Sequence, residues 1–358
     1  MLKENKNKKI FVGLSGGVDS AVSAYMLKKQ NFDVVGVYIK TWQPEFITCT
    51  WPEERRDAMR VCAHLDIPFL MFDFSHDYEK LVAEKFINDY KNGLTPNPDI
   101  LCNREIKFGL FLDKAKSMGA DAIATGHYAR VVESKKLKVI KYELAKGIDE
   151  SKDQSYFLWT LTSEDLSHTI FPLGSMTKKE VRVIAKEANL PVSEKKDSQG
   201  VCFIGDIGMK DFLKNYIKEH GGIVKDKEGN VLGTHDGVEF FTLGERHGFN
   251  ITNKAPDSER LYVVSKDIEK NEIVVDKEIN NFGKFEVVLK DLNIVDDIKN
   301  GDKYKCQIRY HGEYLDCSIK EINKDKLTLE FTEKVLVSIG QSVVIYDGDI
   351  VVAGGVVS

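Results

Sequence analysis

Apolar residues in the first third of the chain alternate between short continuous runs and stretches with helical spacing. The runs predict strands, and they read KIFVGL, DVVGVYI, IPFLMFD and DAIAT, beginning near residues 9, 33, 67 and 121. Stretches with a helical period lie between them, at about residues 20–30, 53–65, 76–91 and 104–118. Gly93 and Gly119 stand where the last two of these helices would end. This alternation predicts an α/β fold with a doubly wound parallel sheet, which binds ligands beyond the carboxyl ends of its strands.

The pattern changes to β-type alternation later in the chain. Residues 129–147, ARVVESKKLKVIKYELAKG, read as two β runs around a charged turn, and Thr177 and Glu180 then have the spacing of a capping box. From about residue 281 apolar and polar residues alternate repeatedly, which predicts a small antiparallel β-barrel. We therefore expect three domains, namely an α/β domain over 1–207, a small central domain over 208–278 and a C-terminal β-barrel domain over 279–358.

Composition narrows the class of protein. With 358 residues, of which 42% are hydrophobic, the chain suits several domains with ample cores. Six cysteines over this length are no disulfide scaffold, and the start MLKENKNKK lacks the long apolar stretch of a secretory signal, so we expect a cytoplasmic protein with reduced thiols. No run approaches the roughly 20 apolar residues of a membrane span. A net charge of −5 argues against a generally basic nucleic-acid binder but is compatible with a local basic patch.

A glycine-rich loop, LSGGVDS, joins the first predicted strand to the first predicted helix. Gly16 and Gly17 permit positive φ and let backbone N–H groups face outward, while Ser15 and Ser20 add hydroxyls and the helix start adds partial positive charge. This combination predicts an anion cradle, although a plain βα turn is the commoner meaning of a Gly-Gly pair. The loop is neither a Walker P-loop, because no lysine follows the glycines, nor a G-x-G-x-x-G dinucleotide loop.

Two further stretches place a cysteine among residues that are unusual for a core. In TPNPDILCNREIKFG, Pro96 and Pro98 predict a rigid loop, Asp99 and Cys102 are three residues apart, and a helix is expected to begin at Asn103 or the next residue. A thiol near a helix N-terminus has a lowered pKa. The alternatives are an Asx-turn for the aspartate and a buried structural role for the thiol.

The second stretch is KKDSQGVCFIG, in which Cys202 follows Lys195 and Lys196 in what reads as an electropositive loop. A buried structural thiol is the alternative here as well. We assign no role to the other cysteines: Cys62, which we expect on the apolar side of its helix together with Met59 and Leu65, Cys306 and Cys317, which fall in β runs, and Cys49, which falls in a loop.

Five ordered blocks of the sequence resemble the tRNA-specific 2-thiouridylases. They are SGGVDS, TPNPDILCNREIKF, ATGHY, KDQSYFL and KDSQGVCFIG, beginning at residues 15, 95, 124, 152 and 196. The tail GQSVVIYDGDIVVAGG is similar to the last strands of that family, so the resemblance covers nearly the whole chain. It places the protein in the ATP pyrophosphatase (PP-loop) superfamily and implies an adenine nucleotide alpha hydrolase-like fold, in which residues 1–207 form the catalytic domain and residues 208–278 a tRNA-binding domain.

The resemblance implies a sulfurtransferase that adenylates O2 of the wobble uridine (position 34) of tRNA and then replaces this oxygen by sulfur. ATP and Mg²⁺ would be required, and no resident metal site is expected. The implied nucleotide-binding residues are Gly13, Leu14, Ser15, Gly16, Gly17, Val18, Asp19, Ser20, Ile39 and Gly126. The implied partners are tRNAs for lysine, glutamate and glutamine, together with a persulfide-donating sulfur carrier or a cysteine desulfurase.

The family match also assigns roles around the two cysteines. Sulfur is implied to arrive as a persulfide on Cys202, with Asp99 as general acid or base. Cys102 is implied as the second thiol, which either forms a disulfide with Cys202 as the terminal sulfur departs or helps to generate free sulfide for the attack. Because the target base is stacked in the anticodon loop, it must be flipped out to be reached. The implied tRNA contacts are Asn97, Pro98, Asp99, His127, Lys152, Asp153, Gln154, Arg309, Tyr310 and Gln341.

Some positions depart from the family pattern. The central segment reads GERHGFNI, with Glu245 and His247 where glutamine and lysine are usual, and we expect this change to weaken a phosphate contact. The loop TWQPEFITCTWPEE, from residue 41, is also idiosyncratic. Two other classes share part of the pattern: small-molecule ATP pyrophosphatases such as amidating synthetases, and non-catalytic tRNA-binding proteins. Neither needs the phosphate loop together with two loop thiols, and iron–sulfur tRNA thiolases need a C-x-x-C pair that the sequence lacks.

Overall fold

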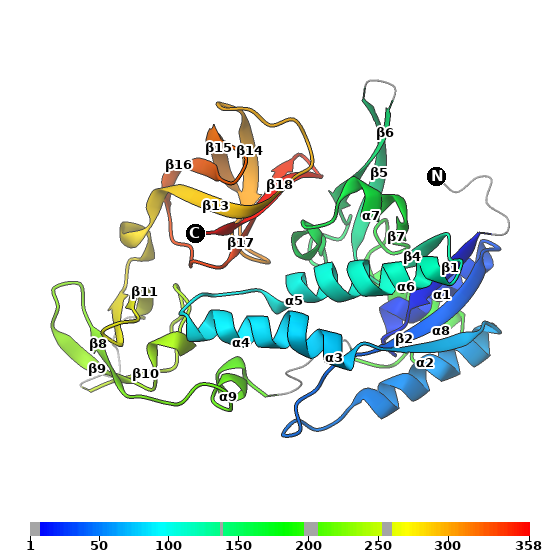
Figure 1. Ribbon diagram of the computed structural model, residues 1–358, viewed down its shortest axis with the longest axis horizontal. Helices are drawn as coiled ribbons and strands as arrows, with labels where there is room; N and C mark the ends of the chain where they lie inside the picture. Colours follow the sequence, from blue (N-terminus) through cyan, green and yellow to red (C-terminus); the bar gives the residue numbers. More distant parts are fainter. Residues whose placement is uncertain (1–7, 137–138, 197–206, 253–259) are drawn as a thin grey trace. The chain divides into compact units, whose positions relative to one another are not determined.

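The computed structural model of the protein describes residues 8–136, 139–196, 207–252 and 260–358. Contacts between Cα atoms divide the chain into two compact units. Figure 1 draws both units in one ribbon diagram. The first unit consists of residues 1–82, 98–206 and 347–352, and the second consists of residues 83–97, 207–346 and 353–358.

A five-stranded sheet forms the centre of the first unit, with the strand order β3-β2-β1-β4-β7 and parallel pairing throughout. Its strands are β1 (Lys9–Gly13), β2 (Asp33–Lys40), β3 (Phe69–Asp73), β4 (Ala122–Ala124) and β7 (Thr169–Ile170). The order runs outward from β1 in one direction and from β4 in the other, so the topological switch point lies between β1 and β4. The predicted doubly wound parallel sheet is confirmed.

Helices cover both faces of this sheet. The helices of residues 18–187, of which α4 belongs to the second unit, are α1 (Val18–Lys29), α2 (Trp51–Leu65), α3 (Ser75–Tyr78), η1 (Glu79–Ala83), α4 (Glu84–Lys91), α5 (Pro98–Leu101), η2 (Cys102–Leu110), α6 (Phe111–Ser117), η3 (Ser155–Leu158), α7 (Ser163–Ser167) and α8 (Lys178–Glu187). The predicted capping box of Thr177 and Glu180 begins α8, and Gly93 and Gly119 follow helix ends with φ of 71° and 82°.

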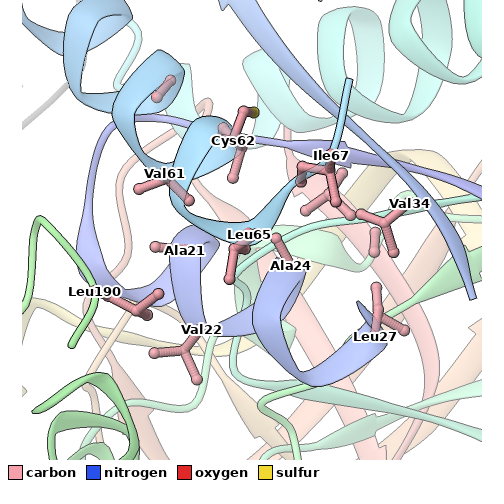
Figure 2. Packing of buried hydrophobic residues seen from close by; sticks show 14 of the residues in the cluster. Ala21, Val22, Ala24, Leu27, Val34, Val61, Cys62, Leu65, Ile67 and Leu190 are labelled. Carbon is pink, nitrogen blue, oxygen red and sulfur yellow. The ribbon is translucent and has the colours of Figure 1, made fainter. Parts of the chain in front are cut away.

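A large apolar core lies where α1, α2 and α8 pack on one face of the sheet. Figure 2 shows Ala21 and Ala24 of α1 on either side of Leu65 of α2, and Cys62 belongs to the same buried cluster. Met59 departs from the prediction, because 41% of its surface is exposed while Cys62 and Leu65 are buried. The helical spacing was right, but the position of Met59 falls at the solvent edge of the apolar stripe.

Aromatic rings pack on the opposite face of the sheet. The ring centroid of Phe72 lies 6.5 Å from that of Phe11 and 6.2 Å from that of Phe111, which belongs to α6. Since both faces are buried, the strands are continuous apolar runs, as is usual for parallel sheets. A hairpin of β5 (Ala129–Lys136) and β6 (Val139–Lys146) extends this unit as predicted, and Ile350 pairs with Ala145 of β6.

The second unit contains a small sheet and a closed barrel. The sheet has the order β10-β9-β8-β12-β11, and its strands are β8 (Gly222–Lys225), β9 (Val231–His235), β10 (Phe249–Ile251), β11 (Tyr262–Asp267) and β12 (Glu272–Asp276). The short helices α9 (Met209–Leu213), η4 (Val238–Phe240) and η5 (Ile279–Phe282) accompany it.

The barrel consists of six antiparallel strands in the order β13-β16-β15-β14-β17-β18, and it closes where β18 pairs with β13. Its strands are β13 (Lys284–Ile294), β14 (Lys303–Gln307), β15 (Leu315–Ile322), β16 (Leu327–Val335), β17 (Ser342–Asp347) and β18 (Ile350–Val357). The predicted C-terminal antiparallel barrel is confirmed. Among the helices of the described residues, none has the length and apolar character required to cross a membrane.

Candidate active site at the carboxyl edge of the parallel sheet

The glycine-rich loop lies at the switch point of the sheet, between β1 and α1. Gly16 has φ of 74°, and a Cβ atom on it would lie 2.6 Å from the Glu54 carbonyl oxygen, so only glycine fits. Ser20 Oγ donates to the Gly17 carbonyl at 3.1 Å and accepts from the Ser15 backbone N–H at 3.2 Å. Gly17 is the N-cap of α1 and has no side chain to cap it, so the first backbone N–H groups of this helix are available to an anion.

A lysine reaches this loop from far along the sequence. Lys178, the first residue of α8, donates from Nζ to both carboxylate oxygens of Asp19 at 2.7 and 2.8 Å. The hydroxyl of Tyr128 also donates to Asp19 Oδ1 at 2.8 Å, and the Lys178 backbone N–H donates to Asp149 Oδ2 at 2.9 Å. The Lys178 side chain is only 14% exposed. Lys178 was not among the predicted site residues, because the capping box places it at a helix start but no sequence pattern links it to position 19.

The loop after β4 packs tightly against the phosphate loop. A Cβ atom on Gly126 would lie 2.8 Å from the Ser20 backbone nitrogen and 3.0 Å from the Asp19 carbonyl carbon, so the two backbones touch. Ile39 lies near the carboxyl end of β2, whose Val37 carbonyl accepts from the Leu14 backbone N–H at 2.8 Å. The structure therefore brings the predicted nucleotide-binding residues to one edge of the sheet. Their contact with a nucleotide stays a prediction.

The segment around Asp99 and Cys102 is helical earlier than expected. Its helix begins at Pro98, and Cys102 is buried as the first residue of the π-helix η2. The predicted helix start at Asn103 or Arg104, with Cys102 in the loop before it, is wrong. Proline fits the first turn of a helix, where no backbone N–H is needed, and an aspartate there complements the helix dipole. The prediction took the proline as a sign of a loop, although proline occurs both in loops and in the first turn of a helix.

π-helical turns are rare and are frequent at functional sites, so the run that carries Cys102 is notable in itself. The other predicted cysteine, Cys202, lies outside the described residues. Of the two lysines before it, Lys195 donates from Nζ to Asp57 Oδ2 at 2.9 Å. The carboxylate of Asp57 therefore balances part of the positive charge that we expected in this segment.

Burial shifts the pKa values of Asp99 and His127. Burial raises the pKa of Asp99, and the charge of Lys107 opposes that rise. Burial also holds the pKa of His127 well below its ordinary value, and Lys107 lowers it further. The Nδ1 atom of His127 lies 2.7 Å from Thr125 Oγ1, and its Nε2 atom lies 3.5 Å from Lys107 Nζ.

The environment of His127 is aromatic. Its ring centroid lies 5.8 Å from that of Phe108 and 6.0 Å from that of Phe171. Only 8% of the residue is exposed. A neutral imidazole held in this way suits a role inside the site, whereas the contact of His127 with tRNA stays a prediction.

Two residues of the KDQSYFL block serve as internal hydrogen-bond partners. Asp153 accepts from the Gly147 and Ser155 backbone N–H groups at 2.9 and 3.1 Å and from the Ser155 hydroxyl at 2.8 Å, and burial raises its pKa. Gln154 Oε1 accepts from the Tyr128 backbone N–H at 3.0 Å. Gln154 thus fixes the loop that follows β4, and Asp153 fixes the turn that follows β6. The predicted tRNA contacts of Asp153 and Gln154, and of half-buried Lys152, are not tested by these bonds.

The remaining predicted tRNA contacts lie in the second unit, apart from Pro98, which begins α5. Arg309 is exposed, Tyr310 stacks on His311 with ring centroids 3.9 Å apart, and Gln341 Oε1 accepts from the Ser338 backbone N–H at 3.0 Å. Asn97 is half-buried and precedes α5. Each of these roles stays a prediction.

The two departures from the family pattern have different environments. Glu245 Oε2 accepts from the Thr242 backbone N–H at 3.0 Å, and burial raises the pKa of this carboxyl. His247 is exposed. The carboxyl of Glu245 is thus used inside its turn, while its expected effect on phosphate binding stays a prediction.

Metal ligands are not clustered in the described part of the chain. No group of three or more His, Cys, Asp or Glu side chains lies there in an arrangement that could hold a metal ion. Asp19 is the acid of the loop, and its carboxylate accepts from Lys178 and Tyr128.

Comparisons with known proteins cover the whole chain. Family models described as "tRNA methyl transferase HUP domain", "tRNA methyl transferase PRC-barrel domain" and "Aminomethyltransferase beta-barrel domain" match residues 8–206, 210–277 and 285–357. The chain is 41% identical over 365 residues to "tRNA-specific 2-thiouridylase MnmA" of Bacillus subtilis (strain 168), covering 100% of this chain and 96% of that protein. It is 39% identical over 360 residues to the protein of the same name from Staphylococcus carnosus (strain TM300), covering 99% and 96%.

Proposed function

The chain belongs to the family of the tRNA-specific 2-thiouridylases, and on this premise we propose that it replaces O2 of the wobble uridine (position 34) of tRNA by sulfur. It is a sulfurtransferase that uses ATP to activate the oxygen. One observation carries the proposal: contacts run from the phosphate loop through Gly126 to His127 and Lys107, whose charge acts on Asp99. These contacts support an activation site and an acid–base group at one edge of the sheet.

The phosphate loop fits the activation step. Oxygen is a poor leaving group on C2, and ATP supplies an adenylate that leaves as AMP. The open N-terminus of α1 and the serine hydroxyls would hold the departing pyrophosphate. The lysine that the loop itself lacks would come from Lys178, and Asp19 would hold Mg²⁺ together with phosphate oxygens. Ile39 and Gly126 would border the adenosine.

The sulfur step uses the cysteines. A persulfide on Cys202 would carry the sulfur, and its terminal sulfur would form the new bond to C2 as AMP departs. The thiolate of Cys102 would attack the inner sulfur of Cys202, so that the persulfide S–S bond breaks and a Cys102–Cys202 disulfide forms. An external thiol then reduces this disulfide. Asp99 would act as general acid or base beside the base, with Asn97 and Pro98 shaping the pocket.

The finer assignments belong to the same proposal. The substrates would be tRNAs for lysine, glutamate and glutamine, the sulfur would come from a persulfide carrier or a cysteine desulfurase, and the reaction would take place in the cytoplasm. Residues 1–207 would form the catalytic domain, residues 208–278 a tRNA-binding domain and residues 279–358 the barrel domain. The side chains proposed to touch tRNA outside the Asp99 pocket are His127, Lys152, Asp153, Gln154, Arg309, Tyr310 and Gln341.

The test is a single-turnover reaction with purified protein, unmodified tRNA, ATP, Mg²⁺ and a persulfide source. Mass spectrometry of the nucleosides should find 2-thiouridine, and the nucleotide products should be AMP and pyrophosphate. Cys202→Ser should load no sulfur, whereas Cys102→Ser should load sulfur and fail to transfer it. ADP as the product would refute the assignment of the loop, and absence of 2-thiouridine with a sulfur-loaded wild type would refute the function.

A further inference from the structure

Tyr128 joins the loop after β4 to the phosphate loop. Its hydroxyl donates to Asp19 Oδ1 at 2.8 Å. Lys178 Nζ, which donates to both oxygens of the same carboxylate, lies 5.9 Å from the centroid of the Tyr128 ring. Tyr128 is 3% exposed and belongs to the apolar core in which α1, α2 and α8 pack. Because the phenol is rigid, the position of its hydroxyl depends on the position of the Tyr128 backbone.

Gln154 holds that backbone by two hydrogen bonds. Its side-chain Oε1 accepts from the Tyr128 N–H at 3.0 Å, and its own backbone N–H donates to the Tyr128 carbonyl at 2.9 Å. Both polar groups of the Tyr128 main chain are thereby bound to one residue, which lies 26 positions later in the chain. Two bonds on opposite groups of one residue limit its rotation as well as its translation.

The turn before Gln154 restricts the same tyrosine. A Cβ atom on Gly147 would lie 2.8 Å from the Tyr128 carbonyl oxygen, so the two backbones are in contact. Asp153, which is buried, accepts from the Gly147 N–H at 2.9 Å and keeps this glycine in place. Residues 147–154 therefore hold the backbone of a tyrosine whose hydroxyl lies at the phosphate loop.

We propose that Gln154 is a positioning residue of the nucleotide site: through its bonds to the Tyr128 backbone it holds the Tyr128 hydroxyl on Asp19. The role in nucleotide binding rests on the proposed function of the phosphate loop, whereas the link between the three residues does not. Donors from two distant segments, Tyr128 and Lys178, orient the Asp19 carboxylate before a nucleotide enters. Gln154 is also a proposed tRNA contact, but its positioning role needs no tRNA.

The test is a double-variant cycle on the free protein, without tRNA. Tyr128→Phe removes the hydroxyl and keeps the buried ring, and Gln154→Met removes the acceptor and keeps the length of the side chain. Isothermal titration calorimetry should show that each single variant binds Mg²⁺-ATP roughly 3- to 10-fold more weakly, the range that one hydrogen bond supplies. Because both changes act on the same bond to Asp19, adding Gln154→Met to the Tyr128→Phe protein should weaken binding by less than about twofold.

Further measurements separate positioning from a general loss of structure. Gln154→Glu keeps an oxygen acceptor for the Tyr128 N–H and should bring the ATP affinity back to within about twofold of the wild type. Glu150→Met makes a matched change at an exposed residue shortly before Gln154 and should leave the ATP affinity unchanged. In thermal unfolding, which needs no nucleotide, the double variant should lose less in unfolding temperature than the two single variants added together.

Two results would overturn the proposal. One is a folded Gln154→Met protein that binds Mg²⁺-ATP as tightly as the wild type, which would leave Gln154 without a role at the nucleotide site. The other is additivity, in which Gln154→Met causes the same loss of ATP affinity and of unfolding temperature whether residue 128 is tyrosine or phenylalanine. A wild type that binds no Mg²⁺-ATP would refute the assignment of the phosphate loop, and the unfolding cycle would then decide the link by itself.

Discussion

Replacing Lys178 by methionine tests whether α8 supplies the cation of the phosphate loop. The change removes two charge-assisted hydrogen bonds, of 2.7 and 2.8 Å, to Asp19. Methionine keeps the length and the apolar stem of the side chain. The capping box of Thr177 and Glu180 that starts α8 does not use the Lys178 side chain, so the helix should still form.

The expected loss of stability follows from how deeply the Lys178–Asp19 ion pair is buried. Exposed ion pairs contribute about 0.2–1 kcal/mol, and breaking a fully buried pair costs about 3–5 kcal/mol. Here the Lys178 side chain is 14% exposed, but that of Asp19 is 33% exposed and keeps the hydrogen bond from Tyr128, so water can solvate the remaining carboxylate. We therefore expect the unfolding free energy of the first unit to fall by about 1–2 kcal/mol, between these limits.

The affinity for pyrophosphate should fall by more than the stability does. A hydrogen bond to a charged group is worth about 1.5–3 kcal/mol, which corresponds to a roughly 10- to 150-fold weaker affinity for Mg²⁺-pyrophosphate. Isothermal titration calorimetry measures the affinity, and thermal unfolding measures the stability. Lys179→Met is the control, because Lys179 is the exposed neighbour on the same helix. If a folded Lys178→Met protein binds pyrophosphate within twofold of the wild type, Lys178 only anchors Asp19 and our assignment is wrong.

Three further variants test other parts of the structure. Gly16→Ala should lower the unfolding free energy by about 1–3 kcal/mol and abolish ATP binding. The reason is that Gly16 has φ of 74° and an added Cβ would clash with the Glu54 carbonyl. ATP binding as in the wild type would contradict this. Asp99→Asn should slow thiolation about 10²- to 10⁴-fold with little change in tRNA affinity, whereas exposed Asp113→Asn should not; equal rates would make Asp99 structural. Burial lowers the pKa of Lys266 to about 8, so between pH 8 and 10.5 the unfolded chain binds more protons than the folded chain. As the pH rises through this range, the wild type should therefore gain about 1–3 kcal/mol of stability over Lys266→Met in denaturant titrations. A stability difference that stays constant over this range would refute this.

The strands β1 to β4 were predictable because burial on both faces makes each of them a continuous apolar run, whereas the two-residue strand β7 was not predicted. The residue at which a helix begins was harder to predict where that residue type favours two structures. Proline at position 98 fits a loop or the first turn of a helix, and the wrong choice placed Cys102 in a loop, although it lies inside a helical run. No local pattern distinguishes these outcomes, because packing of the following turns decides between them.

Contacts between distant segments were beyond the reach of the sequence. Lys178 and Asp19 are 159 residues apart and meet only because α8 packs on α1. Lys107 contacts His127 across 20 residues, and the sequence analysis named His127 as an implied tRNA contact without linking it to Lys107. Periodicity reports which face of an element is buried, but it does not report what that face meets.

The π-helical run from Cys102 to Leu110 changes how this helix tolerates the loss of a residue. A π turn contains about one more residue than the 3.6 residues of an α turn. Deleting a single residue within the run would let it rewind as an α-helix of nearly the same length, so that the turns on either side keep their orientation. Deleting a residue from the α-helical turns of α6 would instead rotate every later side chain of the helix by about 100°. A one-residue deletion should therefore be less harmful within the π-helical run than in the α-helical turns that follow it.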